Sequence, residues 1–198
     1  WQDEVDREAP SAKSKRGDEG PAHLLIEKRL STAGSKRKLL FTSSPTTEDG
    51  PIYTMWQDGS AGEYHVPCPH CGELQVLTWE HVRWDGDPRG PKSEFDCWYE
   101  CAACHERIDE WQKSVMFAEE NGARWIHAHP ERPDRSFRLP TLYAAVGGRD
   151  WKDMAKSYCL AVDALKLGDS EPMKVFKQTD LAECYEYVGE SEVPTNVL

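Results

Sequence analysis

The chain has 198 residues, of which 38% are hydrophobic and 30% charged, and its formal net charge is −11. This length allows one or two domains with a buried core, and the lack of any apolar run near 18 residues argues against a transmembrane helix. The opening residues are acidic and not apolar, so we expect no signal peptide. Seven cysteines, an odd number, argue against a disulfide framework and favour a reducing compartment.

The negative charge is unevenly distributed along the chain. Residues 1–50 hold nine acidic and nine basic side chains, so residues 51–198 account for the whole net charge. Binding to nucleic acid phosphates requires clustered Lys and Arg side chains. Composition therefore does not predict non-specific DNA binding by residues 51–198.

The N-terminal quarter combines an acidic stretch with short periodic segments. Residues 3–6 read DEVD, and residues 9–22 are rich in Ser, Gly, Pro and charge, which is typical of a loop. Leucines spaced among charged residues predict a short helix over 22–33. The apolar run 39–41 lies before a Ser-Ser-Pro turn and predicts a buried parallel strand that ends in a functional loop. Another helix is expected at 51–58.

The middle of the chain, residues 62–112, contains five of the cysteines and has strand character. Strands are expected at 74–79 and 93–100, separated by a loop rich in Gly and Pro. A helix at 113–122 and a strand–loop–strand segment at 123–139 should follow.

The C-terminal part contains the clearest helix pattern. Asp150 is placed to cap it and Gly168 to end it, and apolar residues recur at spacings of three and four. These residues are Trp151, Met154, Tyr158, Val162 and Leu165. We interpret this face as core packing and not as a membrane or partner surface. A shorter helix, 171–181, should follow with Pro172 in its first turn.

Four cysteines have the spacing of a zinc ribbon. Cys68 and Cys71 form one Cys-x-x-Cys pair, and Cys101 and Cys104 form a second. Each pair can bind one ion from a tight turn, and Gly72 suits the positive φ that such a turn often needs. Four thiolates leave no open position for water, so the expected zinc is structural.

Other side chains near the two pairs compete as ligands or have simpler roles. Cys97, His70 and His105 are alternative ligands that we rank below the four cysteines. Cys159 and Cys184 are expected to be buried thiols. The tryptophans around the pairs are expected mainly to pack the ribbon and not to stack on bases, and they are Trp79, Trp84, Trp98 and Trp111.

The DEVD stretch and the Ser-Ser-Pro turn, taken together, indicate a nucleotide site. In P-loop ATPases an Asp at the end of a strand holds Mg²⁺ and a following carboxylate orients the attacking water. Asp3 and Glu4 fit these roles, and the hydroxyls of Ser43 and Ser44 fit a loop that senses the γ-phosphate. Taken alone, the first motif also fits a solvated acidic turn, and the second a simple β-turn.

The order of these motifs resembles the large terminase subunit of tailed phages, the lambda-type family. The resemblance rests on DEVD, then KLLFTSSPTTEDGPIYTMW, then EYHVPCPHCGELQVLTW. It continues through GARWIHAHPE, SFRLPTLYA, DWKDMAKSYCLA and VFKQTDLAECYE, and so covers nearly all of residues 1–190. CPHCG is its most specific part. The chain departs from the family pattern at Gln178, Ala182 and Tyr185, where the family usually has Asn, Gly and Trp.

The resemblance implies an α/β fold: part of a P-loop ATPase core with an inserted zinc ribbon and following helices. The implied division is 1–60 for the ATPase part, 61–112 for the ribbon, and 113–198 for a segment leading to a nuclease domain beyond the chain. The sequence has no G-x-x-x-x-G-K-[ST] loop for phosphates. We therefore expect no ATP turnover by this chain alone.

By resemblance, the complete protein would cut concatemeric viral DNA and drive it into a procapsid, using ATP and Mg²⁺. Asp3 would bind the metal, Glu4 would activate water, and Ser43 and Ser44 would couple hydrolysis to movement. The implied partners are double-stranded viral DNA, the small terminase subunit and the portal, in the bacterial cytoplasm, without a membrane and compatible with a homo-oligomer. The alternatives are a non-enzymatic zinc module that docks a protein or nucleic acid, and an inactive prophage remnant.

Overall fold

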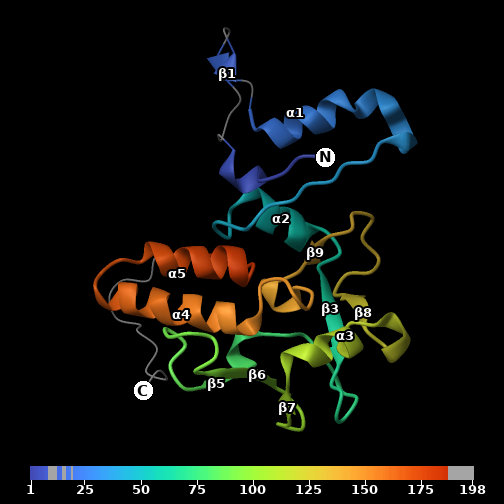
Figure 1. The fold of residues 1–198 in the computed structure, drawn as a ribbon. Coiled ribbons are helices and arrows are strands. Elements are labelled where there is room, and N and C mark those ends of the chain that lie inside the picture. Colours follow the sequence, from blue (N-terminus) through green and yellow to red (C-terminus); the bar gives the residue numbers. More distant parts are fainter. Residues whose placement is uncertain (9–12, 15–16, 19, 187–198) are drawn as a thin grey trace.

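The computed structural model describes residues 1–8, 13–14, 17–18 and 20–186. Helices and short strands alternate along the chain, which confirms the mixed α/β class. Figure 1 shows the N-terminal elements set apart at one end, and helices α4 and α5 lying side by side over the strands β5 and β6.

The N-terminal part consists of short elements with little regular pairing. They are η1 (Val5–Arg7), β1 (Lys13–Ser14), β2 (Gly17–Asp18), α1 (Ala22–Arg29), η2 (Ser31–Lys36) and α2 (Pro51–Asp58). The loop expected at 9–22 lies partly outside the described residues, and its described part contains the β1–β2 hairpin. The strand expected at 39–41 is present only as one parallel bridge between Gln2 and Phe41. Among the described residues, a multistranded ATPase sheet is therefore not seen.

The first sheet is centred on β3 (Gly62–Pro67). It has the order β4 (Leu74–Gln75), β3, β8 (Arg124–His127), and β9 (Phe137–Arg138) also pairs with β3, in parallel. In the antiparallel β3–β8 pair, Tyr64 lies opposite Trp125, and their ring centroids are 5.2 Å apart. The sheet joins segments more than 60 residues apart in the sequence.

The second sheet is formed by β5 (Val82–Asp85), β6 (Asp96–Glu100) and β7 (Arg107–Ile108), all antiparallel. Tyr99 of the central strand lies opposite Val82 on one side and Ile108 on the other, and all three are buried. The strand expected at 74–79 was wrong in extent, because pairing stops at Gln75 and the chain turns into η3 (Trp79–His81). The strand instead begins at Val82, and it pairs with the edge of β6 that β7 leaves free.

The remaining elements are helical. They are η4 (Glu110–Gln112), α3 (Lys113–Met116), η5 (Glu119–Asn121), η6 (Thr141–Tyr143), α4 (Trp151–Lys166), α5 (Glu171–Val175) and η7 (Phe176–Asp180). The helix expected at 113–122 is broken into α3 and η5. The helix expected at 171–181 is shorter, because α5 passes into the single π-type turn η7.

Helix α4 forms as its pattern predicts. The Asp150 side chain accepts a hydrogen bond from the Asp153 N–H at 2.7 Å, which caps the first turn. Gly168 follows the helix with a φ of +86°, the left-handed conformation that glycine adopts without strain. The buried face of α4 faces the β5–β6–β7 sheet, so helix and sheet share one core.

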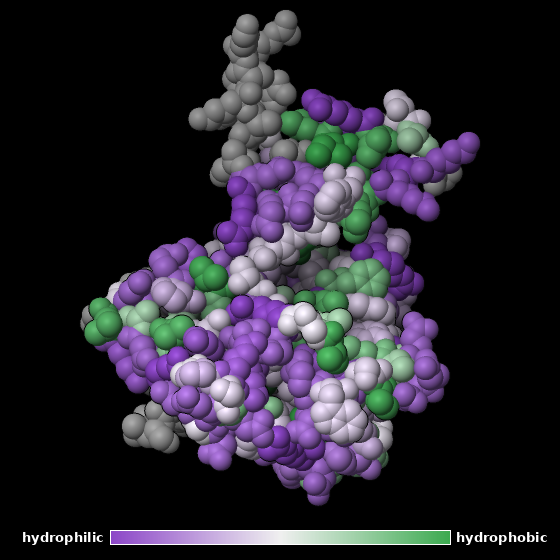
Figure 2. Space-filling model, viewed as in Figure 1, coloured by the Kyte–Doolittle hydropathy of each residue, from purple (hydrophilic) through white to green (hydrophobic). Residues whose placement is uncertain are grey.

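The surface is mostly polar, in keeping with a mean hydropathy of −0.73. Figure 2 shows hydrophilic side chains over most of the visible face and hydrophobic ones gathered over α1. Among the exposed apolar side chains of the N-terminal part are Leu24 and Leu40. No helix of the described residues is long and apolar enough to cross a membrane.

A buried ion pair lies where the core meets the start of α4. The side chain of Lys113 is fully buried, forms an ion pair with Glu110, and lies 4.5 Å from the centre of the Trp151 ring. Glu110 also accepts a hydrogen bond from the Trp151 N–H at 3.1 Å. Burial lowers the pKa of Lys113 and raises the pKa of Glu110, so each charge depends on the other for compensation.

Removing one partner of this pair should cost more than removing both charges. We expect Lys113→Met to lower the free energy of unfolding by about 3 kcal/mol, because Glu110 is left as an uncompensated buried charge. The double variant Glu110→Gln with Lys113→Met should recover most of that loss, since the Gln oxygen can still accept from Trp151. Urea unfolding followed by circular dichroism measures both values. Equal losses for the single and double variants would contradict the role given to this pair.

Candidate functional site

The two predicted ATPase motifs lie next to each other in the structure. The Gln2 N–H donates to the Leu40 carbonyl at 2.9 Å, and the Thr42 N–H donates to the Gln2 carbonyl at 3.0 Å. These bonds make the two segments parallel, so both end at the same edge. Beyond that edge, the Thr42 hydroxyl donates a hydrogen bond to the Asp3 carboxylate. Sequence analysis did not single out Thr42, although it directly precedes Ser43.

Glu4 lies at the point where the chain leaves the first of these segments. Its φ is +54° and its ψ 42°, a left-handed conformation that is unusual for a residue with a side chain. Such conformations often occur at functional sites, where the surrounding structure enforces them. The Glu4 carboxylate is exposed and forms an ion pair with Arg7 at 2.8 Å. The Glu4 backbone N–H donates to the Asp3 carboxylate at 3.1 Å, so the two acidic residues are linked at the end of this segment.

Ser43 and Ser44 follow Thr42 in the Ser/Thr loop, which we define as residues 42–47. The Ser43 hydroxyl accepts a hydrogen bond from the Asp6 N–H at 3.2 Å and donates to the Ser44 carbonyl at 3.0 Å. Both serines are half-buried. Ser43 thus ties the Ser/Thr loop to the acidic segment.

Asp6 is the anchor of this region, and sequence analysis gave it no role. Its carboxylate accepts hydrogen bonds from the Thr46 N–H at 2.9 Å, the Thr46 hydroxyl at 3.0 Å and the Ile52 N–H at 2.7 Å. Ile52 lies in the first turn of α2, whose own N-cap residue, Gly50, has no side chain to offer. Asp6 therefore supplies the negative charge that a helix N-terminus favours. The sequence shows Asp6 only as the second Asp of DEVD. Its role could not be recognised there, because its hydrogen-bond partners lie about 40 residues further along the chain.

The four predicted metal ligands come together at one point. The Sγ atoms of Cys68, Cys71, Cys101 and Cys104 all lie within 4.8 Å of one another. The Sγ separation is 3.8 Å between Cys68 and Cys104 and 3.9 Å between Cys71 and Cys101. Four thiolates placed tetrahedrally at about 2.3 Å from zinc would be separated by about 3.8 Å. The cluster is therefore compatible with a tetrahedral zinc site.

The two cysteine turns have the same backbone geometry. The Gly72 N–H donates to the Cys68 carbonyl at 2.9 Å, and the His105 N–H donates to the Cys101 carbonyl at 3.0 Å. Gly72 and His105 both have positive φ, of 77° and 61°. This matches the expectation for Gly72 and shows that a histidine takes the equivalent position in the second turn.

The pKa values of two thiols in the cluster shift in opposite directions. Burial raises the pKa of Cys68 to about 12. Burial acts in the same direction on Cys101, but the N–H groups of Cys104 and Ala103 stabilise its thiolate and lower its pKa to about 7. A cation among the four sulfur atoms would favour the deprotonated form of each.

The alternative ligands do not join the cluster. Cys97 is buried opposite Trp84 within the second sheet, and burial raises the pKa of its thiol to about 12. The His70 ring interacts through Nε2 with the Arg107 carbonyl at 2.8 Å, while His105 is exposed. Of the groups considered, the structure brings together only the four cysteines first predicted.

The tryptophans near the cysteine pairs mostly pack against other side chains. Trp79 stacks on Trp84 with ring centroids 6.1 Å apart, and Trp79 also contacts Tyr158 and Phe176 at 5.2 and 5.0 Å. Trp98 lies under the Arg107 guanidinium at 4.6 Å. Trp111 differs, being 64% exposed.

Polar contacts fix the loop between β5 and β6 to α4. Arg89 forms two hydrogen bonds with Asp163, of 2.5 and 2.9 Å, and Lys92 forms ion pairs with Asp150 and Asp153. Lys152 in turn donates to the Phe95 carbonyl at 2.7 Å. The cysteine-containing region is thus attached to α4 by apolar packing in the centre and ion pairs at the rim.

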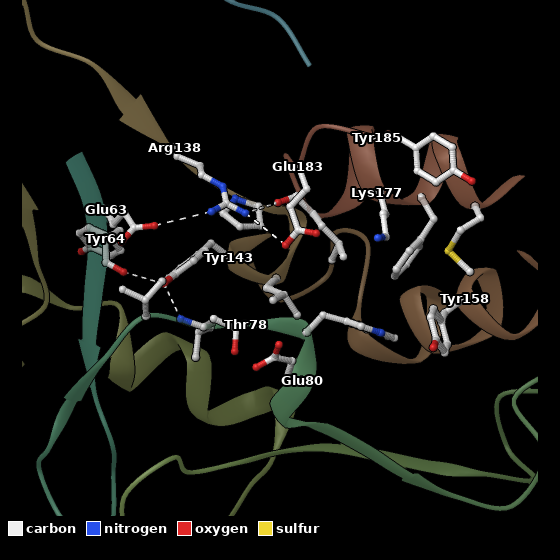
Figure 3. Close-up of a pocket in the computed structure, with 18 of the residues that line it drawn as sticks. Glu63, Tyr64, Thr78, Glu80, Arg138, Tyr143, Tyr158, Lys177, Glu183 and Tyr185 are labelled. Atoms are coloured by element: carbon white, nitrogen blue, oxygen red, sulfur yellow. Dashed lines mark hydrogen bonds and ion pairs between the residues drawn. The ribbon is translucent and has the colours of Figure 1, made fainter. Parts of the chain in front are cut away.

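A cavity of about 840 Å³ lies between β3, residues 76–80 and the α4–α5 pair. Figure 3 shows Arg138 at its wall between Glu63 and Glu183, with ion-pair distances of 3.7 and 3.3 Å. The cavity has an aromatic lining that includes Tyr64, Trp79, Tyr143, Tyr158, Phe176 and Tyr185. Because Arg138 also donates to the carbonyls of residues 181 and 182, it fixes the C-terminal segment to β3.

Two protein-family models match the chain. The model described as "Phage terminase large subunit gpA, ATPase domain" matches residues 1–125. The model described as "Terminase large subunit gpA, endonuclease domain" matches residues 134–198. No curated protein and no solved structure matches.

The endonuclease match corrects one expectation from the sequence. The resemblance places the nuclease domain beyond the chain, but residues 134–198 match the family model of that domain. The expectation came from the family resemblance alone, and among the described residues of this segment no carboxylates cluster as a metal site. The match to the ATPase part, by contrast, agrees with the resemblance found in the motifs. The chain belongs to the phage terminase large subunit gpA family, whose members are large subunits of DNA-packaging terminases, and it includes both ATPase and endonuclease sequence.

Proposed function

We propose that Asp3 and Glu4 are the metal-binding and water-activating carboxylates of the terminase ATPase, and that the Ser/Thr loop couples hydrolysis to DNA movement. One observation carries this proposal. The parallel pairing of Gln2 with Phe41 brings Asp3 to Thr42, although the two motifs lie about 40 residues apart. Side chains beyond the carboxyl ends of parallel strands are the usual position of nucleotide sites in α/β proteins.

The chemistry of the residues fits a bound Mg²⁺–ATP. Mg²⁺ prefers carboxylate and hydroxyl oxygens together with phosphates, and Asp3 and Thr42 offer these groups side by side. Glu4 is accessible and can accept a proton from water once Arg7 releases it. Ser43 and Ser44 lie on the same loop, where their hydroxyls can respond to the presence of a γ-phosphate. The sequence contains no phosphate-cradling loop, so tests of turnover require the complete large subunit.

We further propose that the four clustered cysteines bind one structural zinc ion. Four thiolate ligands close the coordination shell and leave no position for catalysis. Cys101 directly follows β6, the strand whose Tyr99 packs near Trp151 of α4 at a centroid distance of 5.9 Å. The ion would therefore stabilise the surface on which the first long helix of the endonuclease part rests.

In this proposal residues 1–60 form the ATPase part and residues 61–112 the zinc ribbon, both inside the ATPase match, and residues 113–198 lead into the endonuclease part, whose match begins at residue 134. The complete enzyme would act in the host cytoplasm on double-stranded viral DNA, with the small terminase subunit and the portal as partners. Family membership supports this over a free-standing zinc module, because both enzymatic parts of the family match.

Replacing the proposed base should abolish turnover. In the complete large subunit we expect Glu4→Gln to lower kcat for DNA-stimulated ATP hydrolysis by about 100-fold or more, the usual contribution of a general base. Binding of ATP should persist, because the amide keeps the shape of the site. Glu27→Gln, at an exposed position of α1, is the matched control. Normal turnover by Glu4→Gln would refute the assignment.

Metal content should separate the true ligands from Cys97. We expect one zinc per chain by mass spectrometry in the unmodified protein and in Cys97→Ala, because Cys97 lies apart from the cluster. Cys101→Ala should lose the ion. A folded, metal-free protein, or loss of zinc from Cys97→Ala, would count against the four-cysteine site.

Loss of the metal should lower the local stability of α4. We expect hydrogen exchange of the α4 backbone to accelerate when zinc is removed by chelation, because β6 carries both a ligand turn and the helix contact. Exchange in α2, which lies well apart from β6 and β7 in Figure 1, serves as the internal control. If both helices respond equally, or neither responds, the metal does not specifically support α4.

A further inference from the structure

One residue of the Ser/Thr loop, Thr46, is bound from two sides by distant parts of the chain. Its N–H and hydroxyl donate to Asp6, at 2.9 and 3.0 Å. Its carbonyl accepts from the Gln178 side chain at 2.9 Å and from the Tyr185 N–H at 3.1 Å. Asp6 belongs to the ATPase match, whereas Gln178 and Tyr185 belong to the endonuclease match.

The contact on the ATPase side is close and specific. Asp6 lies two residues after Glu4, within η1, and its carboxylate also caps α2 through the Ile52 N–H at 2.7 Å. A Cβ atom on Gly50 would lie 2.5 Å from the Asp6 Oδ2 atom and 3.0 Å from the Thr47 carbonyl oxygen. Gly50 therefore leaves the space in which the carboxylate reaches the Ser/Thr loop.

The contact on the endonuclease side is held equally firmly. Gln178 is only 5% exposed, lies in the π-type turn η7, and donates from its amide to the Thr46 carbonyl at 2.9 Å. Arg138 binds the carbonyls of Leu181 and Ala182, at 3.2 and 3.0 Å, and so fixes the segment that carries Tyr185. A π-type turn inserted in a helix is commonly found at functional positions.

We propose that Asp6 and Gln178 are positioning residues that hold the Ser/Thr loop between the ATPase site and the endonuclease segment, with Thr46 as the point of contact. Displacement of the loop at the nucleotide end would then strain the bonds to Gln178 and Tyr185. Equally, the seating of the endonuclease segment sets the position of Ser43 and Ser44. This inference rests on the proposed ATPase function and adds the route by which the two activities of the enzyme influence each other.

If Asp6 and Gln178 had only local structural roles, the effects of their substitutions would differ from those expected here. If Asp6 only capped α2 and Gln178 only satisfied a buried carbonyl, the two side chains would act independently. Substitutions at independent sites have additive effects, whereas residues that share a partner show coupling. The test therefore needs both single variants and their combination.

The experiment uses the complete large subunit with Asp6→Asn, Gln178→Leu and the double variant. Asp58→Asn and Gln57→Leu, both exposed at the far end of α2, are matched controls. The first measurement is hydrogen exchange of the Thr46 and Ile52 amides without nucleotide. Asp6→Asn should accelerate both by about tenfold or more, the effect of weakening a charge-assisted hydrogen bond. Gly50→Ala should do the same without changing any donor or acceptor.

The second measurement is kcat for DNA-stimulated ATP hydrolysis. Each single variant should lower kcat by a few-fold with little change in KM, and the double variant should lose less than the product of the two losses. The proposal would be overturned if the double variant lost the full product of the two single losses in kcat. It would also be overturned if Asp6→Asn left the exchange of the Thr46 and Ile52 amides unchanged. Because the exchange readout needs no turnover, a failure of this proposal can be told apart from full activity of Glu4→Gln, which would defeat the ATPase assignment itself.

Discussion

The fold depends on the burial of one face of α4 against the β5–β6–β7 sheet. A three-stranded sheet of such short strands, and a single helix of 16 residues, are each marginal in water on their own. Together they bury Tyr99, Trp151, Met154 and Val162 almost completely. The ion pairs at the rim, such as Arg89 with Asp163, add little free energy because they are partly exposed, but they fix the helix in register. The ATPase and endonuclease parts of the family therefore meet here in one shared core.

Strand β6 connects this core to the cysteine cluster. Cys97, Tyr99 and Cys101 alternate along one face of the strand, and all three are buried. Only Cys101, at the end of the strand, reaches the other thiols, while Cys97 remains among the residues that support α4. The position of a residue along the strand, more than its chemistry, thus decides which cysteine is a ligand and which is core.

Local patterns predicted the parts of the structure that depend on neighbours in sequence. The α4 helix followed from its spacing and from Asp150, and the four cysteines followed from their two short turns. Parts that depend on distant pairing were missed. The strand β5 could not be recognised because Val82 acquires its pairing only from β6, and Asp6 looked like one more surface carboxylate because Thr46 and Ile52 lie far along the chain. The resemblance placed the nuclease domain beyond the chain, and the described part of residues 134–198 contains no carboxylate cluster that marks it.

The two ends of the molecule are stabilised in different ways. Among the described residues, the main hydrophobic cluster begins at Val66, whereas the acidic segment and the Ser/Thr loop are joined by hydrogen bonds of Asp3, Asp6 and Ser43. Apolar cores are close-packed and do not deform gradually, whereas a few hydrogen bonds can be exchanged without exposing buried surface. Segments of low local stability are the ones that move in binding and coupling. The Ser/Thr loop lies between the hydrogen-bonded N-terminal segments and the close-packed core. Asp6 binds it from the N-terminal segments, and the buried Gln178 binds it from the core. In the proposed coupling, a shift of Asp3 and Thr42 would reach the packed core through Thr46 without disrupting the residues that hold the endonuclease segment.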